Sequence, residues 1–272
     1  MRRIVMRKTT RRVALVGLAA IVLWVGLDLF GQRQFDLRDF DAVEVARLET
    51  DMWRSYYERR QVRLFLQLAG LLRTQFRLPF LRSHVVAFSA ARAAFIFKDG
   101  SGRESYERAL PALKNFYAAI RKASVTSFDS DKVAKLELEW WIVHRSRDKE
   151  ALSRALAYLQ AELFHLPAER FTDHGRLRAE AMLLRDARWE SGMTESDWST
   201  INGLLERSWQ DLWTKVHAGS SPVFKGATPA KWNELFRPLP DHRRLAAFLL
   251  FRTDCRTTAR NVSRTGDLMS RR

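Results

Sequence analysis

A single Glu-x-x-His pair is the closest approach in this sequence to a metal-binding motif. Glu162 and His165 lie three residues apart, so a helix would carry both side chains on one face, as in carboxylate-bridged di-iron bundles. Those bundles use the motif twice, whereas this chain has one copy. Glu137, His144 and Glu49 are further residues that could converge on the pair, and Glu137 and His144 share a helix face because they are seven residues apart.

A structural interpretation of the same pair needs no metal. A glutamate fits the outer face of a helix, and a histidine near a helix C-terminus meets a partial negative charge that favours its protonated form. The sequence lacks His-x-x-x-His and Cys-x-x-Cys spacings, and Cys255 is its only cysteine, so an intrachain disulfide is excluded. The sequence favours this interpretation, and we expect no cofactor.

Nucleophilic catalysis has no motif to support it. The chain contains histidines and serines, but no Gly-x-Ser-x-Gly elbow and no glycine-rich phosphate loop. These absences from the sequence argue against an enzyme without deciding the matter.

Adjacent tryptophans form the densest aromatic feature. Trp140 and Trp141 would point about 100° apart on a helix, so we expect one to pack in the core and the other to line a groove. Glu137 or Glu139 could accept a hydrogen bond from a buried indole N–H. The alternative is that both side chains simply fill the core.

A second aromatic stretch, residues 53–60, mixes tyrosine and tryptophan with arginine. Trp53 and Tyr57 could extend an interaction groove formed with Trp140 and Trp141. Interleaved aromatic and basic residues can also bind single-stranded nucleic acid. Because this stretch follows the apolar run over residues 13–30, which we expect to enter a membrane, we expect no nucleic-acid partner. A contact with anionic headgroups, or ion pairs within the helix surface, is favoured.

Residues 13–30 are predicted to anchor the chain in a membrane. This run of 18 residues is apolar except for Asp28 at its far end, and a hydrocarbon core of about 30 Å needs roughly 17–25 helical residues. Residues 1–12 carry six basic and no acidic side chains. The positive-inside rule therefore predicts a cytoplasmic N-terminus near anionic lipid, a single pass, and a soluble domain on the extracytoplasmic side of the cell membrane.

Three alternatives to an anchor remain at this stage. A cleaved signal peptide usually has a shorter apolar core and a small-x-small site, which is missing here. Residues 10–15 loosely resemble a twin-arginine export signal, but Ala14 stands where a bulky residue is usual. A buried helix of a soluble protein does not explain the asymmetry of the flanking charges.

The net charge of +16 belongs mainly to the two ends of the chain. Residues 1–12 contribute +6 and residues 217–272 contribute +7, with eleven basic and four acidic side chains. Residues 13–216 hold 30 basic and 27 acidic side chains, which is typical of an ordinary solvated helical surface.

Hydrophobic periodicity predicts an all-α fold, with no sustained strand pattern. We expect a domain over residues 36–216, an antiparallel bundle of about seven helices, and a Pro- and Arg-rich tail at 217–272 that is largely disordered. In the helix expected over residues 80–98, the side chains predicted to face inward are Val85, Phe88, Ala91, Phe95 and Ile96. The expected helices cover residues 39–77, 80–98, 103–123 (with Pro111 as a kink or the true start), 131–146, 148–165, 167–191 and 194–216.

Two functional hypotheses follow. The first is a membrane-anchored helical domain that binds a partner protein or lipid at the cell envelope. The second is a helical metal-binding protein or enzyme centred on Glu162 and His165.

Overall fold

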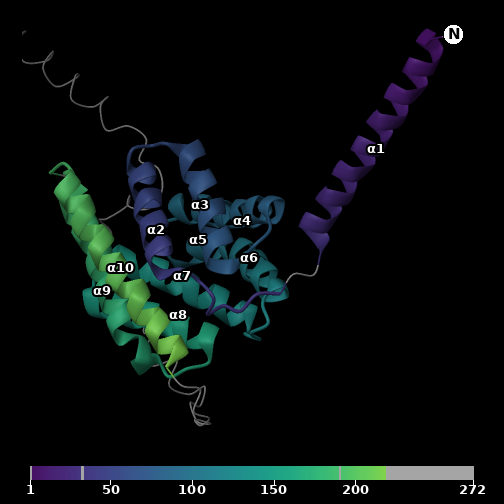
Figure 1. Ribbon diagram of the computed structural model, residues 1–272. Coiled ribbons are helices and arrows are strands. Elements are labelled where there is room, and N and C mark those ends of the chain that lie inside the picture. The colour runs from purple at the N-terminus through teal and green to yellow at the C-terminus, as the bar shows by residue number, and fades with distance from the viewer. Residues whose placement is uncertain (1, 32–33, 190, 219–272) are drawn as a thin grey trace, which may run out of the picture.

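The protein is all-helical in a computed structural model, which describes residues 2–31, 34–189 and 191–218. The first helix, α1 (Arg2–Phe30), projects from a domain built by all the others (Figure 1). The domain helices are α2 (Ala42–Tyr57), α3 (Gln61–Phe76), α4 (Phe80–Lys98), α5 (Arg103–Glu107), α6 (Leu110–Ala123), α7 (Ser130–Ser146), α8 (Lys149–Phe164), the 3₁₀ turn η1 (Ala168–Phe171), α9 (Thr172–Trp189) and α10 (Glu195–His217).

The domain is organised by packing between helices that are close in sequence. Contacts run from α2 to α3, α3 to α4, α4 to α6, and then pairwise from α6 to α10. The last helix, α10, also packs on α2 and so joins the two ends of the domain (Figure 1). A continuous apolar core runs through these contacts.

Several helices begin, within a residue or so of their expected starts, at polar residues that cap them. Asp129 accepts hydrogen bonds from the backbone of α7, and Asp148 does the same for α8. Thr194 and Asp197 form a complete capping box at the start of α10. These side chains satisfy backbone N–H groups that have no partner inside the helix.

The predicted single helix over 39–77 is wrong, because the chain breaks between α2 and α3. Arg59 adopts a left-handed conformation with φ 60°, and the N–H of Arg60 bonds to the carbonyl of Ser55. No proline or glycine marks this break. The helices separate because α2 packs on α10 while α3 packs on α4.

The predicted inward face of the helix over 80–98 is wrong for three of its five residues, whereas Ile96 does pack against the core. Val85, Phe88 and Phe95 are exposed, at 59%, 64% and 48% of their surface, whereas small residues such as Ser83 and Ala87 are buried. Nearly every face of this helix is apolar, so periodicity cannot select the buried one. The structure instead buries the face formed by Ser83, Val86, Ala87, Ala93 and Phe97, and α4 packs on α3 and α6.

Two prolines lie at the beginnings of helical segments. Pro111 is the second residue of α6, so the predicted 103–123 segment is divided into α5 and α6. Pro167 precedes η1 and thereby delays the start of α9. The predicted disordered tail, 217–272, lies outside the described residues from 219 onward.

Candidate functional site

The residues of the predicted metal site are held by separate partners. Glu162 pairs with Lys132 at 2.6 Å. His165 ends α8 in a left-handed conformation, with its ring against the carbonyl oxygen of Ser127. Within the described ranges, no group of three or more His, Cys, Asp or Glu side chains is placed to hold a metal ion.

Glu137 accepts hydrogen bonds from two aromatic side chains. The Tyr117 hydroxyl donates at 2.8 Å and the Trp141 indole N–H donates at 2.9 Å. Glu137 is thus one of the two acceptors that the sequence suggests for an indole. Burial is the main reason that the pKa of Tyr117 lies well above its ordinary value, and the neighbouring Glu137 carboxylate adds to it.

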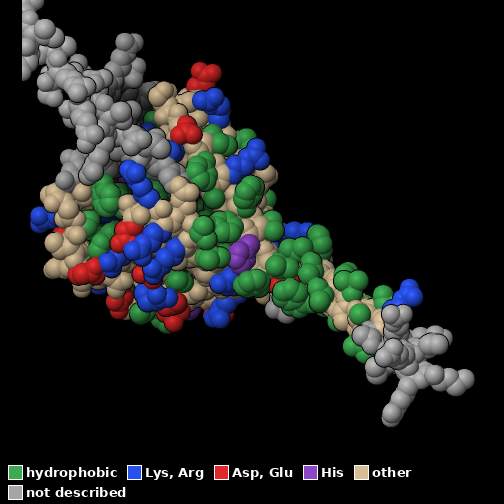
Figure 2. Space-filling view, turned by 90° about the horizontal axis from the view of Figure 1, so that it is seen from above, with side chains coloured by type: hydrophobic (Ala, Val, Ile, Leu, Met, Phe, Trp, Pro, Cys, Tyr) green, Lys and Arg blue, Asp and Glu red, His purple; other side chains and the backbone are tan. Residues whose placement is uncertain are grey.

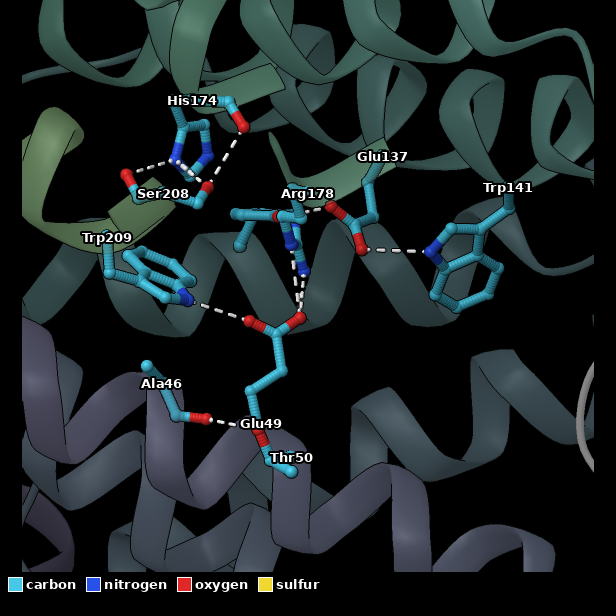
Figure 3. A network of polar contacts seen from close by, with 10 residues as sticks. Ala46, Glu49, Thr50, Glu137, Trp141, His174, Arg178, Ser208 and Trp209 are labelled. Atoms are coloured by element: carbon cyan, nitrogen blue, oxygen red, sulfur yellow. Dashed lines mark hydrogen bonds and ion pairs between the residues drawn. The ribbon is translucent and has the colours of Figure 1, made fainter. Parts of the chain in front are cut away.

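Glu49 joins three helices from a buried position. Its carboxylate accepts from the Arg178 guanidinium of α9 at 2.7 Å and from the Trp209 indole of α10 at 2.8 Å (Figure 3). Arg178 also lies over the rings of Trp140 and Trp209. The carboxylate on α2 therefore ties α9 and α10 to the start of the domain, and its partners offset the cost of burying its charge.

A second buried ionic cluster centres on Asp186 of α9. The Arg185 guanidinium donates to Asp186 at 2.8 Å, the Tyr57 hydroxyl at 3.1 Å, and His144 Nε2 lies 2.9 Å from its other oxygen. The side chains of His144 and Asp186 are 2% and 4% exposed. This cluster joins α2, α7 and α9.

The ionisation of this cluster follows from burial and charge. Burial alone would raise the pKa of Asp186, but the charge of Arg185 and the contact with His144 outweigh it, so the pKa lies well below its ordinary value. Burial lowers the pKa of His144 despite the hydrogen bond to Asp186. Neutral His144 therefore carries its proton on Nε2 and donates to the carboxylate.

His174 of α9 is fully buried against α10. Its Nδ1 lies 3.0 Å from the carbonyl oxygen of Ser208, and the Ser208 hydroxyl donates to the carbonyl of His174 at 2.9 Å (Figure 3). Burial, and then the charge of Arg178, lower the pKa of His174 to about 3. The imidazole is therefore neutral and acts as a hydrogen-bonded core residue.

Three of the four predicted groove residues, Trp53, Tyr57 and Trp140, pack against arginines. Arg185 lies over the rings of Trp53 and Tyr57, with its guanidinium carbon 4.7 and 5.1 Å from their centroids. Trp140 is buried beside Arg178, and Trp141 is half-buried with its ring edge on Phe97. Trp53, Tyr57 and Trp140 therefore contribute to internal cation–π contacts, whereas Trp141 packs on another aromatic ring.

Sequence reasoning missed Arg178, Arg185 and Asp186. The signal was available, since Arg178 and Arg185 are seven residues apart and share the apolar face of their helix. A buried arginine needs a carboxylate, which Glu49 and Asp186 supply. The carboxylates of both clusters are almost fully buried, with Glu49 and Asp186 5% and 4% exposed, and each of them links helices.

The junction between α1 and α4 is a different kind of polar site. The Asp28 carboxylate accepts from the backbone N–H groups of Leu81 and Arg82, at 2.9 and 3.1 Å. In return the Arg82 guanidinium donates to the carbonyls of Leu29 and Gly31. Each helix end therefore receives its missing partners from the other helix.

This exchange replaces a local cap. The residue before α4 is Pro79, which makes no side-chain cap hydrogen bond, so Asp28 supplies the acceptor from another helix. After α1, Phe35 pairs with the end of α6, where its N–H donates to Ala123 and its carbonyl accepts from Val125. The chain that follows α1 is thus attached to the domain at two places.

The α1 helix is long and apolar enough to cross a membrane over Arg11–Phe30, and only 6% of that stretch is buried. The α4 helix meets the same criteria of length and composition, but 28% of it is buried within the domain. The large exposed side chains of α1 include Val16, Val22 and Leu23.

Comparison with known proteins gave no match to a family model, to a curated protein or to a solved structure. The class that fold and site define is an all-α domain preceded by an apolar helix.

Proposed function

We propose that this protein is a single-pass membrane protein whose helical domain is held at the membrane surface, where it binds a partner protein or lipid. The observation that carries the proposal is the junction of α1 with α4. An apolar helix with almost no buried surface is stable in lipid, and its end is bonded to the domain through Asp28 and Arg82.

The junction also supports an uncleaved anchor rather than a signal peptide. Asp28, Leu29 and Gly31 all make hydrogen bonds to the first turn of α4. Removing the segment would take away the only side-chain cap described for α4. In this proposal the N-terminus is cytoplasmic, since its six basic residues resist translocation.

Cell fractionation tests the anchor. Full-length protein is expected in the membrane pellet after high-speed sedimentation and after an alkaline wash, with an N-terminal tag retained. Leu18→Arg combined with Val22→Arg is the matched variant, because both side chains are exposed and charges at the bilayer centre are costly. This variant should move to the supernatant. Wild-type protein in the supernatant would overturn the proposal.

Topology is tested separately with a reporter fused after residue 272. Alkaline phosphatase should be active there, and green fluorescent protein exported in unfolded form through the general secretory route should be dark. The opposite pattern would reverse the orientation while leaving the anchor in place.

A further inference from the structure

The exposed apolar side chains of the domain gather on two helices. Outside α1, the described residues expose nine large apolar side chains, and six of them belong to α3 and α4. Figure 2 shows apolar side chains both along α1 and on the face of the domain from which it leaves. We name this set the α3–α4 face; its apolar members are Val62, Leu66, Phe80, Val85, Phe88 and Phe95.

The α3–α4 face begins where α1 ends. Phe80 directly precedes the residues whose N–H groups bond to Asp28. The His84 ring then lies against Phe80 and against Phe65 of α3, so the apolar surface continues from one helix to the other. If α1 spans the bilayer, the first turn of α4 therefore lies at the level of the lipid headgroups.

The charge of this region is of one sign. Residues 59–98 contain eight basic and no acidic side chains, although residues 13–216 as a whole carry only +3. Subtracting these eight charges leaves −5 for the remainder of residues 13–216. Arg63 and Arg92 are exposed on α3 and α4 and have no ion-pair partner among the described residues.

We infer that the α3–α4 face docks on an anionic lipid surface, with Val62, Phe88 and their neighbours entering the interface and Arg63 and Arg92 contacting phosphate groups. This inference rests on the proposed anchor. It follows from continuity with α1 and from charge, since apolar and aromatic side chains beside arginines are the composition of interfacial helices.

Charge also argues against two other occupants. A second copy packed symmetrically on this face would bring Arg63 and Arg92 close to the same two arginines of the first copy. The segment 217–272 carries +7, so it would be repelled as well. A partner protein with an acidic surface would satisfy the charge, and the experiment below distinguishes it from lipid.

The test places a spin label at single positions of the full chain in vesicles. Cys255→Ser removes the native thiol, and Phe88→Cys or Val62→Cys introduces one on the α3–α4 face. Arg154→Cys, exposed on α8, is the matched control. With vesicles of phosphatidylcholine and phosphatidylglycerol, labels at 88 and 62 should collide more with oxygen than with a water-soluble nickel chelate, and the label at 154 should show the reverse.

A charge-reversal variant tests the role of the arginines. Arg63→Glu combined with Arg92→Glu should lower the ratio of docked to undocked protein at least about 25-fold, since each basic residue near an anionic surface contributes about fivefold. Replacing phosphatidylglycerol by phosphatidylcholine should shift the label at 88 in the same direction. An unchanged label in both cases would overturn the electrostatic part of the inference.

Flotation of the same vesicles separates failure of the anchor from failure of the docking. If the chain does not float, the proposed function fails. If it floats while the label at 88 remains in water, the docking inference fails and the anchor stands. Two further results overturn lipid docking, namely spin–spin broadening that disappears on dilution with unlabelled chain, and protection of the label only in native membranes.

Discussion

Two regions of this domain treat charge in opposite ways. In α2, α7, α9 and α10, charged side chains are buried and paired, as with Glu49 and Arg178 or Asp186 and Arg185. In α3 and α4 there are no acidic residues, and large apolar side chains are exposed beside arginines. The first arrangement fixes helices to one another. The second leaves an exposed apolar surface, for which we propose a lipid partner. The comparison teaches that the neutral average charge of the folded part conceals two different surfaces.

The largest expected effect comes from breaking the buried cluster. Asp186→Ala leaves Arg185 buried without its carboxylate, which should lower the free energy of unfolding by about 3–5 kcal/mol. Lys149→Ala, which removes a half-exposed pair with Glu180, should cost no more than about 1 kcal/mol. Urea titration of the full chain in detergent, followed by tryptophan fluorescence, measures both. Equal costs would abolish the distinction between buried and surface pairs.

Acid should destabilise the domain through the buried histidines His144 and His174. His174 has a pKa of about 3 when folded and an ordinary value of 6.5, so the unfolded chain binds a proton that the folded chain refuses as the pH falls below 6.5. The contribution of His174 to the free energy of unfolding is therefore complete above about pH 7 and is lost toward pH 3. About 2 kcal/mol of it is lost between pH 7 and pH 5. The depressed pKa of His144 acts in the same direction. Urea titrations at pH 7, 6 and 5 check this, and His174→Gln should flatten the profile.

Helix spacing gives a prediction of intermediate size. A Cβ on Gly175 of α9 would meet the carbonyl oxygen of Ser153 in α8 far inside van der Waals contact, so Gly175→Ala should cost about 1–3 kcal/mol. Gly203→Ala in α10 has no neighbour within 4 Å and should instead stabilise by about 0.5–1 kcal/mol through helix propensity. Thermal unfolding of the two variants should therefore shift in opposite directions.

The smallest expected effect lies at the membrane side. Asp28→Ala removes the acceptor for Leu81 and Arg82, with a loss of about 1 kcal/mol as for other helix caps. Hydrogen exchange should accelerate at the first turn of α4 and stay unchanged in α9. Unchanged protection of Leu81 would mean that the junction does not hold α4 to α1.

The two mistaken expectations show where sequence reasoning reached its limit. The break after α2 has no proline or glycine, and beyond it the two helices pack on different partners, α2 on α10 and α3 on α4. The exposure of Phe88 could not be read from periodicity, since α4 is apolar on almost every side. The break thus depends on α10, which is distant in sequence, and the buried face of α4 depends on how α3 and α6 pack on it.

The sequence by itself determined the helical class, most helix starts and the apolar anchor candidate, because caps, prolines and hydrophobic runs act locally. It also contained the one-sided charge of residues 59–98. Only the tertiary structure decided that Glu49 meets Arg178, that Asp28 caps α4, and that Val85, Phe88 and Phe95 of α4 face outward. These outcomes depend on which helix faces approach one another, and close packing selects them through side-chain size and charge across long stretches of chain.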